Sequence, residues 1–168
     1  MRLSPAASLC LICNFAVLGA CASSGSTTYV IPDRAHNVPA APRLDRGEHA
    51  ALIAQQQIGV RYRYGGTTPG SGFDCSGLVY YSFLQAGLNV PRTSSEQFRA
   101  ARKIALKDAQ PGDIVFFQDQ AKLSHVGIYL GGSRFVHAPS SGKTVSIAQI
   151  DSPYYQEHLV AVGRLGPL

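Results

Sequence analysis

The apolar pattern of this chain changes its period at Pro111-Gly112-Asp113, and this change constrains the fold more than any other feature. Before it, apolar residues recur at helical spacing; after it, they come in short runs separated by turns rich in glycine or serine. Helices followed by a mostly antiparallel sheet of about five to six strands predict an α+β fold. The helices are predicted at residues 46–58, 75–86 and 94–103, and the strands at 114–118, 125–130, 134–138, 144–147 and 159–164.

The first twenty residues have the pattern of a secretory signal, with a basic start and an apolar run too short and interrupted for a good membrane span. The run ends in Leu18-Gly19-Ala20-Cys21, which resembles the lipobox of bacterial lipoproteins, where the cysteine is lipidated and becomes the mature N-terminus. The alternative is an ordinary cleaved signal with Cys21 unmodified. We expect a signal peptide at 1–20, a lipidated N-terminus and flexible tether at 21–45, and a folded domain at 46–168.

The lipobox resemblance also implies a location. Ala22-Ser23 lacks the aspartate that retains lipoproteins in the inner membrane, so we expect the periplasmic side of the outer membrane. The net charge of +5 favours acidic partners or marks a solvated basic surface. No stripe of arginine and lysine interleaved with aromatic residues is present, so nucleic acid is not expected as a partner.

The four cysteines reduce to one free thiol. Cys10 and Cys13 have redox-motif spacing, but both lie in the segment that the signal would lose. Cys21 would carry lipid, and a single remaining thiol cannot form an internal disulfide. Cys75 is therefore either buried and inert or reactive.

Cys75 follows the glycine-rich loop 65–72 and Asp74, which can cap the helix that begins there. In the first turn of a helix, the dipole and free backbone N–H groups stabilise a thiolate and can bind an oxyanion. The alternative is a cysteine that serves only as a small core residue.

His125 and His137 lie in neighbouring predicted strands, and their relation depends on the turn between them. A turn made of Gly131-Gly132 alone would pair Leu130 with Ser133 and place the two imidazoles on opposite faces of the sheet. A three-residue turn or one bulge would return them to a common face. A relay that joins Cys75 to both histidines therefore requires this irregularity.

Five blocks in order resemble the NlpC/P60 family of papain-like cysteine peptidases of bacterial cell walls, and the match runs from about residue 45 to the C-terminus. The blocks are Asp74-Cys75-Ser76-Gly77-Leu78-Val79, Pro91-Arg92-Thr93-Ser94, Pro111-Gly112-Asp113, His125-Val126-Gly127-Ile128-Tyr129 and Phe135-Val136-His137-Ala138.

The resemblance implies that Cys75 is the nucleophile, His125 the general base and His137 the residue that orients the imidazole. It further implies that Tyr62 assists near the oxyanion, although Tyr64 lies close enough to compete for this role. Asp74 and Ser76 match positions that contact the free amine and γ-glutamyl portion of the substrate, and helix capping is their alternative role.

The implied reaction is hydrolysis of the γ-D-glutamyl–meso-diaminopimelate bond in peptidoglycan stem peptides, by a monomer without cofactor or metal. Three alternatives remain open: an inactive wall-binding or scaffold lipoprotein, a thiol acyltransferase on the same fold, and a zinc site made of the cysteine and the two histidines.

Overall fold

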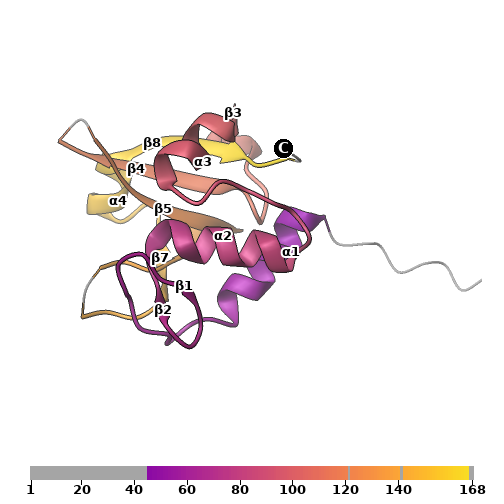
Figure 1. Ribbon diagram of the computed structural model, residues 1–168. Coiled ribbons are helices and arrows are strands. Elements are labelled where there is room, and N and C mark those ends of the chain that lie inside the picture. The colour runs from indigo at the N-terminus through magenta and orange to yellow at the C-terminus, as the bar shows by residue number, and fades with distance from the viewer. Residues whose placement is uncertain (1–44, 121, 141, 167–168) are drawn as a thin grey trace, which may run out of the picture. The chain divides into compact units, whose positions relative to one another are not determined.

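The computed structural model describes residues 45–120, 122–140 and 142–166 (Figure 1). The predicted signal peptide, Cys21 and the tether lie outside the described residues and stay predictions. Within the described part of the chain, no helix is long and apolar enough to cross a membrane. The elements are α1 (Arg46–Gln55), β1 (Thr67–Thr68), β2 (Gly72–Phe73), α2 (Cys75–Gln85), α3 (Ser94–Ala100), β3 (Arg102–Ile104), the 3₁₀ helix η1 (Leu106–Asp108), β4 (Ile114–Asp119), β5 (Lys122–Gly131), β6 (Arg134–His137), β7 (Ser146–Gln149), α4 (Pro153–His158) and β8 (Leu159–Arg164).

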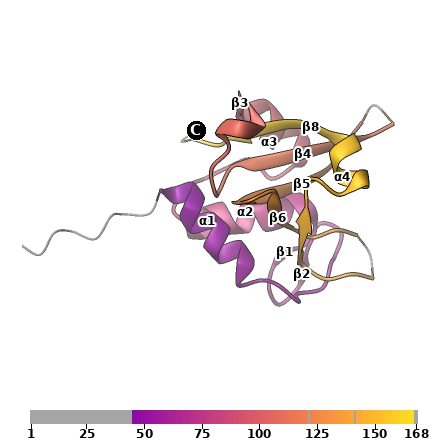
Figure 2. The same cartoon turned by 180° about the vertical axis from the view of Figure 1, so that it is seen from behind.

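The main sheet has the strand order β3-β8-β4-β5-β6-β7, and every neighbouring pair is antiparallel. One face carries residues such as Phe116 and Val126, which share a buried cluster with apolar residues of α1 and α2. Figure 2 shows these two helices on the same side of the sheet. The other face carries a second cluster that includes Phe117 and Phe135, and Tyr155 of α4 packs against it. The predicted α+β fold, with helices first and an antiparallel sheet second, is confirmed.

The third helix ends earlier than predicted. Its capping box, between Thr93 and Glu96, forms as expected, but the helix stops at Ala100 and Ala101 is already extended, with ψ of 130°. Residues 102–104 instead form β3, which pairs with β8 at the edge of the sheet. The prediction of helix to residue 103 was therefore wrong, because pairing with a distant strand outweighed local helix propensity.

Two differences affect the C-terminal third. The sequence prediction missed α4, although Ser152 and Pro153 stand at its N-cap and first helical position. Strand β7 begins at Ser146 rather than at residue 144, because Thr144 and Val145 pair with the backbone of Arg61 and Val60 instead. These pairings bring the segment before α2 against the end of the sheet.

The hairpin between β5 and β6 contains the irregularity that the two histidines require. Tyr129 pairs with Phe135 and Gly131 pairs with Arg134, so Leu130 is an extra residue on β5. The turn itself is Gly132-Ser133, both with positive φ (56° and 58°), one position later than predicted. This single bulge shifts the register by one, and the condition for a common histidine face is met.

Candidate active site

The loop before α2 packs tightly on the first turn of that helix. Tyr62 forms a bridge with Phe73, and the Asp74 N–H donates to the Gly66 carbonyl at 3.2 Å. A Cβ atom at Gly77 would lie 2.0 Å from the Gly66 oxygen, so this approach requires glycine. The loop therefore holds the start of α2, and with it Cys75, in one position.

Asp74 is the N-cap of α2 and the centre of a polar cluster. Its Oδ1 accepts from the Gly77 N–H at 2.6 Å and from the Ser76 hydroxyl at 3.2 Å. Arg92 donates to both carboxylate oxygens, at 3.0 and 2.7 Å, and to the Ser76 hydroxyl oxygen at 2.9 Å. The predicted cap is confirmed, and Asp74, Ser76 and Arg92 form one bidentate, charge-assisted network.

Cys75 is a partly exposed free thiol in the first turn of α2. Burial raises the pKa of the Cys75 thiol, and the negative charge of Asp74 raises it further. The backbone N–H groups of Ser76, Val126 and Cys75 itself lower this pKa, but by less. The expected stabilisation of a thiolate by the helix start is thus present but outweighed, and the resting group is a thiol. The contact with Val126 also places the sulfur beside the residue that follows His125.

His125 and His137 lie on one face of the sheet, and their rings meet directly. His125 Nε2 lies 2.7 Å from His137 Nδ1. Burial lowers the pKa of His125 to about 4. Burial, followed by the charges of His125 and Lys143, lowers the pKa of His137 to about 3. Both rings are therefore neutral at neutral pH, so one of the facing nitrogens donates and the other accepts.

Only one tautomer leaves a base for the thiol. If His125 Nε2 carries the proton and donates to His137 Nδ1, then His125 Nδ1 has a free lone pair. In the described part of the chain, no group of three or more His, Cys, Asp or Glu side chains is arranged to hold a metal ion.

Aromatic side chains hold the histidine pair in place. Phe117 stacks on His125 with ring centroids 6.0 Å apart, and Phe135 lies 4.9 Å from His137. Tyr155 of α4 packs edge-on to His137, and its hydroxyl lies 3.5 Å from His137 Nδ1. The second core cluster of the sheet thus doubles as the support of the imidazoles.

Tyr62 and Tyr64 differ sharply in their surroundings. Tyr64 is 89% exposed, whereas Tyr62 is partly buried and lies near Cys75. Burial, followed by the charges of Cys75, Asp74 and Tyr64, raises the pKa of Tyr62. This proximity to Cys75 favours Tyr62 for an oxyanion role, and its hydroxyl stays protonated, as a donor must.

Sequence reasoning did not assign a role to three residues of the site. Arg92 stood in one of the quoted blocks, and a lone arginine after a proline could have been suspected as the partner of Asp74. The buried Gln97 donates from Nε2 to the carbonyls of Ser76 and Pro91, which ties α3 to the start of α2. Tyr155 lies on the helix that was missed.

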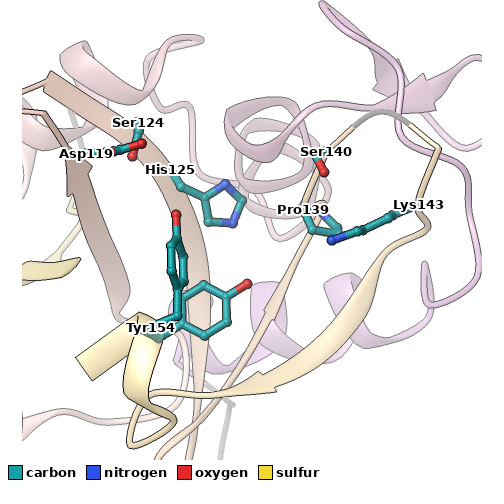
Figure 3. A pocket seen from close by; sticks show the side chains of 8 residues that line it. Asp119, Ser124, His125, Pro139, Ser140, Lys143 and Tyr154 are labelled. Atoms are coloured by element: carbon teal, nitrogen blue, oxygen red, sulfur yellow. The ribbon is translucent and has the colours of Figure 1, made fainter. Parts of the chain in front are cut away.

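Two cavities share Ser124 in their lining, and one of them also contains Cys75 and the other His125. The thiol-side cavity, of about 480 Å³, is lined by Tyr62, Tyr64, Gly65, Asp74, Cys75, Ser76, Arg92, Thr93, Ser94 and Ser124. The histidine-side cavity, of about 410 Å³, is lined by Asp119, Ser124, His125, Pro139, Ser140, Lys143, Tyr154 and Tyr155 (Figure 3). A bound amide between Cys75 and His125 would extend into both.

Comparison with known proteins gives consistent matches. The family model described as NlpC/P60 family matches residues 59–164. The chain is 40% identical over 130 residues to the bifunctional muramidase/DL-endopeptidase CwlT of Bacillus subtilis. It is also 40% identical over 115 residues to the murein DD-endopeptidase MepH of Escherichia coli. These alignments cover 76% and 66% of this chain but 39% and 42% of the relatives, so the chain spans less than half of either.

Solved structures agree. The NlpC/p60 domain of the peptidoglycan hydrolase SagA is 31% identical, with a TM-score of 0.62, and the match covers 71% of this chain and 98% of that one. A lipoprotein-like member of the NLP/P60 family from Staphylococcus aureus is 34% identical, with a TM-score of 0.65, over 71% of this chain and 41% of that one.

Proposed function

The chain belongs to the NlpC/P60 family, and from this premise we propose that it is a peptidoglycan hydrolase, a cysteine endopeptidase that cleaves amide bonds of stem peptides. The observation that carries the proposal is that the Cys75 thiol, at the start of a helix, lies beside Val126, the residue that follows His125 in β5. His125 is neutral and is hydrogen-bonded to His137 at 2.7 Å. These are the parts of a thiol nucleophile with an oriented general base. All three polar positions are filled, which argues against an inactive scaffold.

In the first step, the Cys75 sulfur attacks the amide carbonyl while its proton moves to His125 Nδ1. The Nε2–H of His125 donates to neutral His137, which keeps the ring oriented as it becomes an imidazolium. The N–H groups of Cys75 and Ser76, which point at the sulfur, can also donate to the developing oxyanion. The Tyr62 hydroxyl is the side-chain donor that we assign to the same oxygen.

In the second step, the carbon–nitrogen bond breaks and His125 gives its proton to the leaving amine. Water then enters, loses a proton to His125 and attacks the thioester, and the thiol is restored as the acid product leaves. The acyl half of the substrate is bonded to sulfur, so it occupies the thiol-side cavity with Asp74, Ser76 and Arg92. We assign recognition of the free amine and γ-glutamyl portion to Asp74 and Ser76.

The bond we propose is that between γ-D-glutamate and meso-diaminopimelate. Relatives differ in the bond that their names specify: CwlT is a DL-endopeptidase, MepH a DD-endopeptidase, and a third relative from Bacillus subtilis, 36% identical, is a γ-D-glutamyl-L-lysine dipeptidyl-peptidase. The anionic Asp74 in the thiol-side cavity suits a substrate with a free amine near the scissile bond.

The test is digestion of purified muropeptides with the wild type and with Cys75→Ala, read by mass spectrometry. Products that end at γ-D-glutamate in the first and are absent in the second are expected. Cleavage at a D-alanyl cross-link would overturn the choice of bond. Unchanged digestion after alkylation of Cys75 would overturn the mechanism, and acyl transfer to an amine in place of water would identify an acyltransferase.

We further propose that the mature protein is a monomer anchored by lipid at Cys21 to the periplasmic side of the outer membrane. The lipobox-like end of the apolar segment supports this, as does the description of the Staphylococcus aureus structure as similar to a lipoprotein. Labelling with a palmitate analogue should mark the wild type and not Cys21→Ala. Membrane fractionation then tests the location, and light scattering tests the monomer.

A further inference from the structure

The histidine-side cavity lies next to His125 and has a cation on its wall. Figure 3 shows the Lys143 side chain with its ammonium nitrogen directed into the space that His125 also faces. The backbone of Lys143 is held by two hydrogen bonds, from the Tyr62 N–H at 2.8 Å and to the Ser140 carbonyl at 3.2 Å. The backbone of Lys143 is therefore held against the segment that contains Tyr62, the residue that we assign to the oxyanion.

The charge of Lys143 is available to a ligand. The ion pairs found among the described residues are Arg92–Asp74 and Arg164–Asp113, and neither includes Lys143. The positive charge of Lys143 also acts on the histidine pair, because it contributes to the lowered pKa of His137.

The order of bond breaking fixes which half of the substrate reaches this cavity. The acyl carbon binds to the Cys75 sulfur, and the leaving nitrogen must lie within hydrogen-bond reach of His125. Ser124 lines both cavities, and Cys75 lines one of them and His125 the other. The amine half therefore extends past His125 into the cavity of Lys143, with Asp119 on the other side of His125 in Figure 3.

Two diamino acids can stand at the amine side of such a bond, and they differ by one group. Diaminopimelate is lysine with a carboxylate on the carbon that bears the side-chain amine. Both carry the ammonium, so only the carboxylate distinguishes them. We propose that Lys143 binds this carboxylate, and that the histidine-side cavity thereby selects diaminopimelate over lysine in the leaving half of the substrate.

This inference rests on the proposed function, and the experiment separates the two. The substrates are L-alanyl-γ-D-glutamyl-meso-diaminopimelate and L-alanyl-γ-D-glutamyl-L-lysine, and the quantity measured is the ratio of their kcat/KM values. The variants are Lys143→Met, which removes the charge at similar length, and Lys143→Arg, which keeps it. Lys107→Met, in η1 and outside both cavities, is the matched control.

The wild type should favour the diaminopimelate substrate by about fivefold, the size expected for one ion pair in an open cavity. Lys143→Met should bring the ratio close to one by slowing only that substrate, and Lys143→Arg and Lys107→Met should keep it. An equal loss on both substrates, or a wild type without preference, would overturn the inference and leave the endopeptidase proposal standing. A wild type that cleaves neither peptide nor muropeptides would overturn both.

Discussion

The resting protonation state of the nucleophile is the sharpest chemical prediction. The pKa of Cys75 lies above its ordinary value of 9.0 and that of His125 at about 4, so moving the proton from sulfur to imidazole crosses more than about 5 pH units. At 1.36 kcal/mol per unit this costs about 7 kcal/mol. For any two unit charges about 4 Å apart, at an effective dielectric constant of about 20, the attraction would return about 4 kcal/mol. The neutral pair should therefore dominate by roughly a hundredfold or more at neutral pH.

The perturbation is a pH titration of the folded protein, monitored through the ultraviolet absorbance of the thiolate. The absorbance of the Cys75→Ser variant at each pH is subtracted as the reference. The thiolate signal should be absent at neutral pH and should rise only above about pH 9. A thiolate that titrates with a midpoint below about pH 6 would show a resting ion pair and refute the reasoning. Alkylation by iodoacetamide over the same range gives an independent reading of the same group.

Asp74→Asn tests the cause assigned to the high pKa. Asparagine keeps an N-cap oxygen for the Gly77 N–H but removes the negative charge that raises the pKa of Cys75. The thiolate should then appear at lower pH than in the wild type. An unchanged midpoint would mean that burial alone sets the pKa, whereas a change in the circular dichroism spectrum would point to altered folding instead.

Three further predictions concern stability and support. In the unfolded chain His125 and His137 bind protons near pH 6.5, whereas in the folded protein their pKa values are about 4 and 3. The free energy of unfolding should therefore fall as the pH drops below about 6.5, with His125 contributing on the order of 3 kcal/mol. Urea titrations that show constant stability from pH 7 to about 4 would contradict this. Arg92→Met leaves the Asp74 carboxylate without its bidentate partner and should lower stability by about 1 kcal/mol in urea, while Arg92→Lys restores part of it; equal stability of all three proteins would exclude a stabilising pair. Tyr155→Phe should lower kcat/KM by less than about threefold, since its hydroxyl lies at the 3.5 Å edge of hydrogen bonding to His137, and a loss above about tenfold would make that contact essential.

The sequence allowed the architecture to be predicted because helix and strand periods are local patterns, and the same is true of the motifs that single out Cys75 and the two histidines as candidates. The period change at Pro111-Gly112-Asp113 separated helices from strands, and family membership confirmed the resemblance carried by the blocks around Cys75 and His125. The need for a bulge or an odd-length turn between His125 and His137 could also be derived, because side chains alternate between the two faces of a strand. Whether a bulge or a longer turn would supply the shift could not be derived. The structure has a bulge at Leu130, followed by a two-residue turn in which both residues have positive φ.

What could not be predicted depends on contacts between distant segments. Ala101 leaves the helix because β3 joins β8, whose sequence lies some sixty residues further along the chain. The ion pair of Arg92 with Asp74 joins the loop before α3 to the N-cap of α2, across a separation of 18 residues. Burial of Cys75 raises its pKa against the local influence of the helix start, because desolvation comes from the whole fold and the sequence shows only neighbours.

The Asp74 carboxylate has two opposing effects on Cys75, one through the helix cap and one through its charge. Its cap on the Gly77 N–H orders the first turn of α2 and thereby positions Cys75. The same negative charge opposes any anion on the sulfur or on the developing oxyanion. Arg92 binds both carboxylate oxygens, and its positive charge offsets that of the carboxylate while the cap stays in place. A site with this carboxylate therefore needs a cation as well as an imidazole, and the arginine in the second sequence block is as much a part of the nucleophile's environment as the cysteine's own helix.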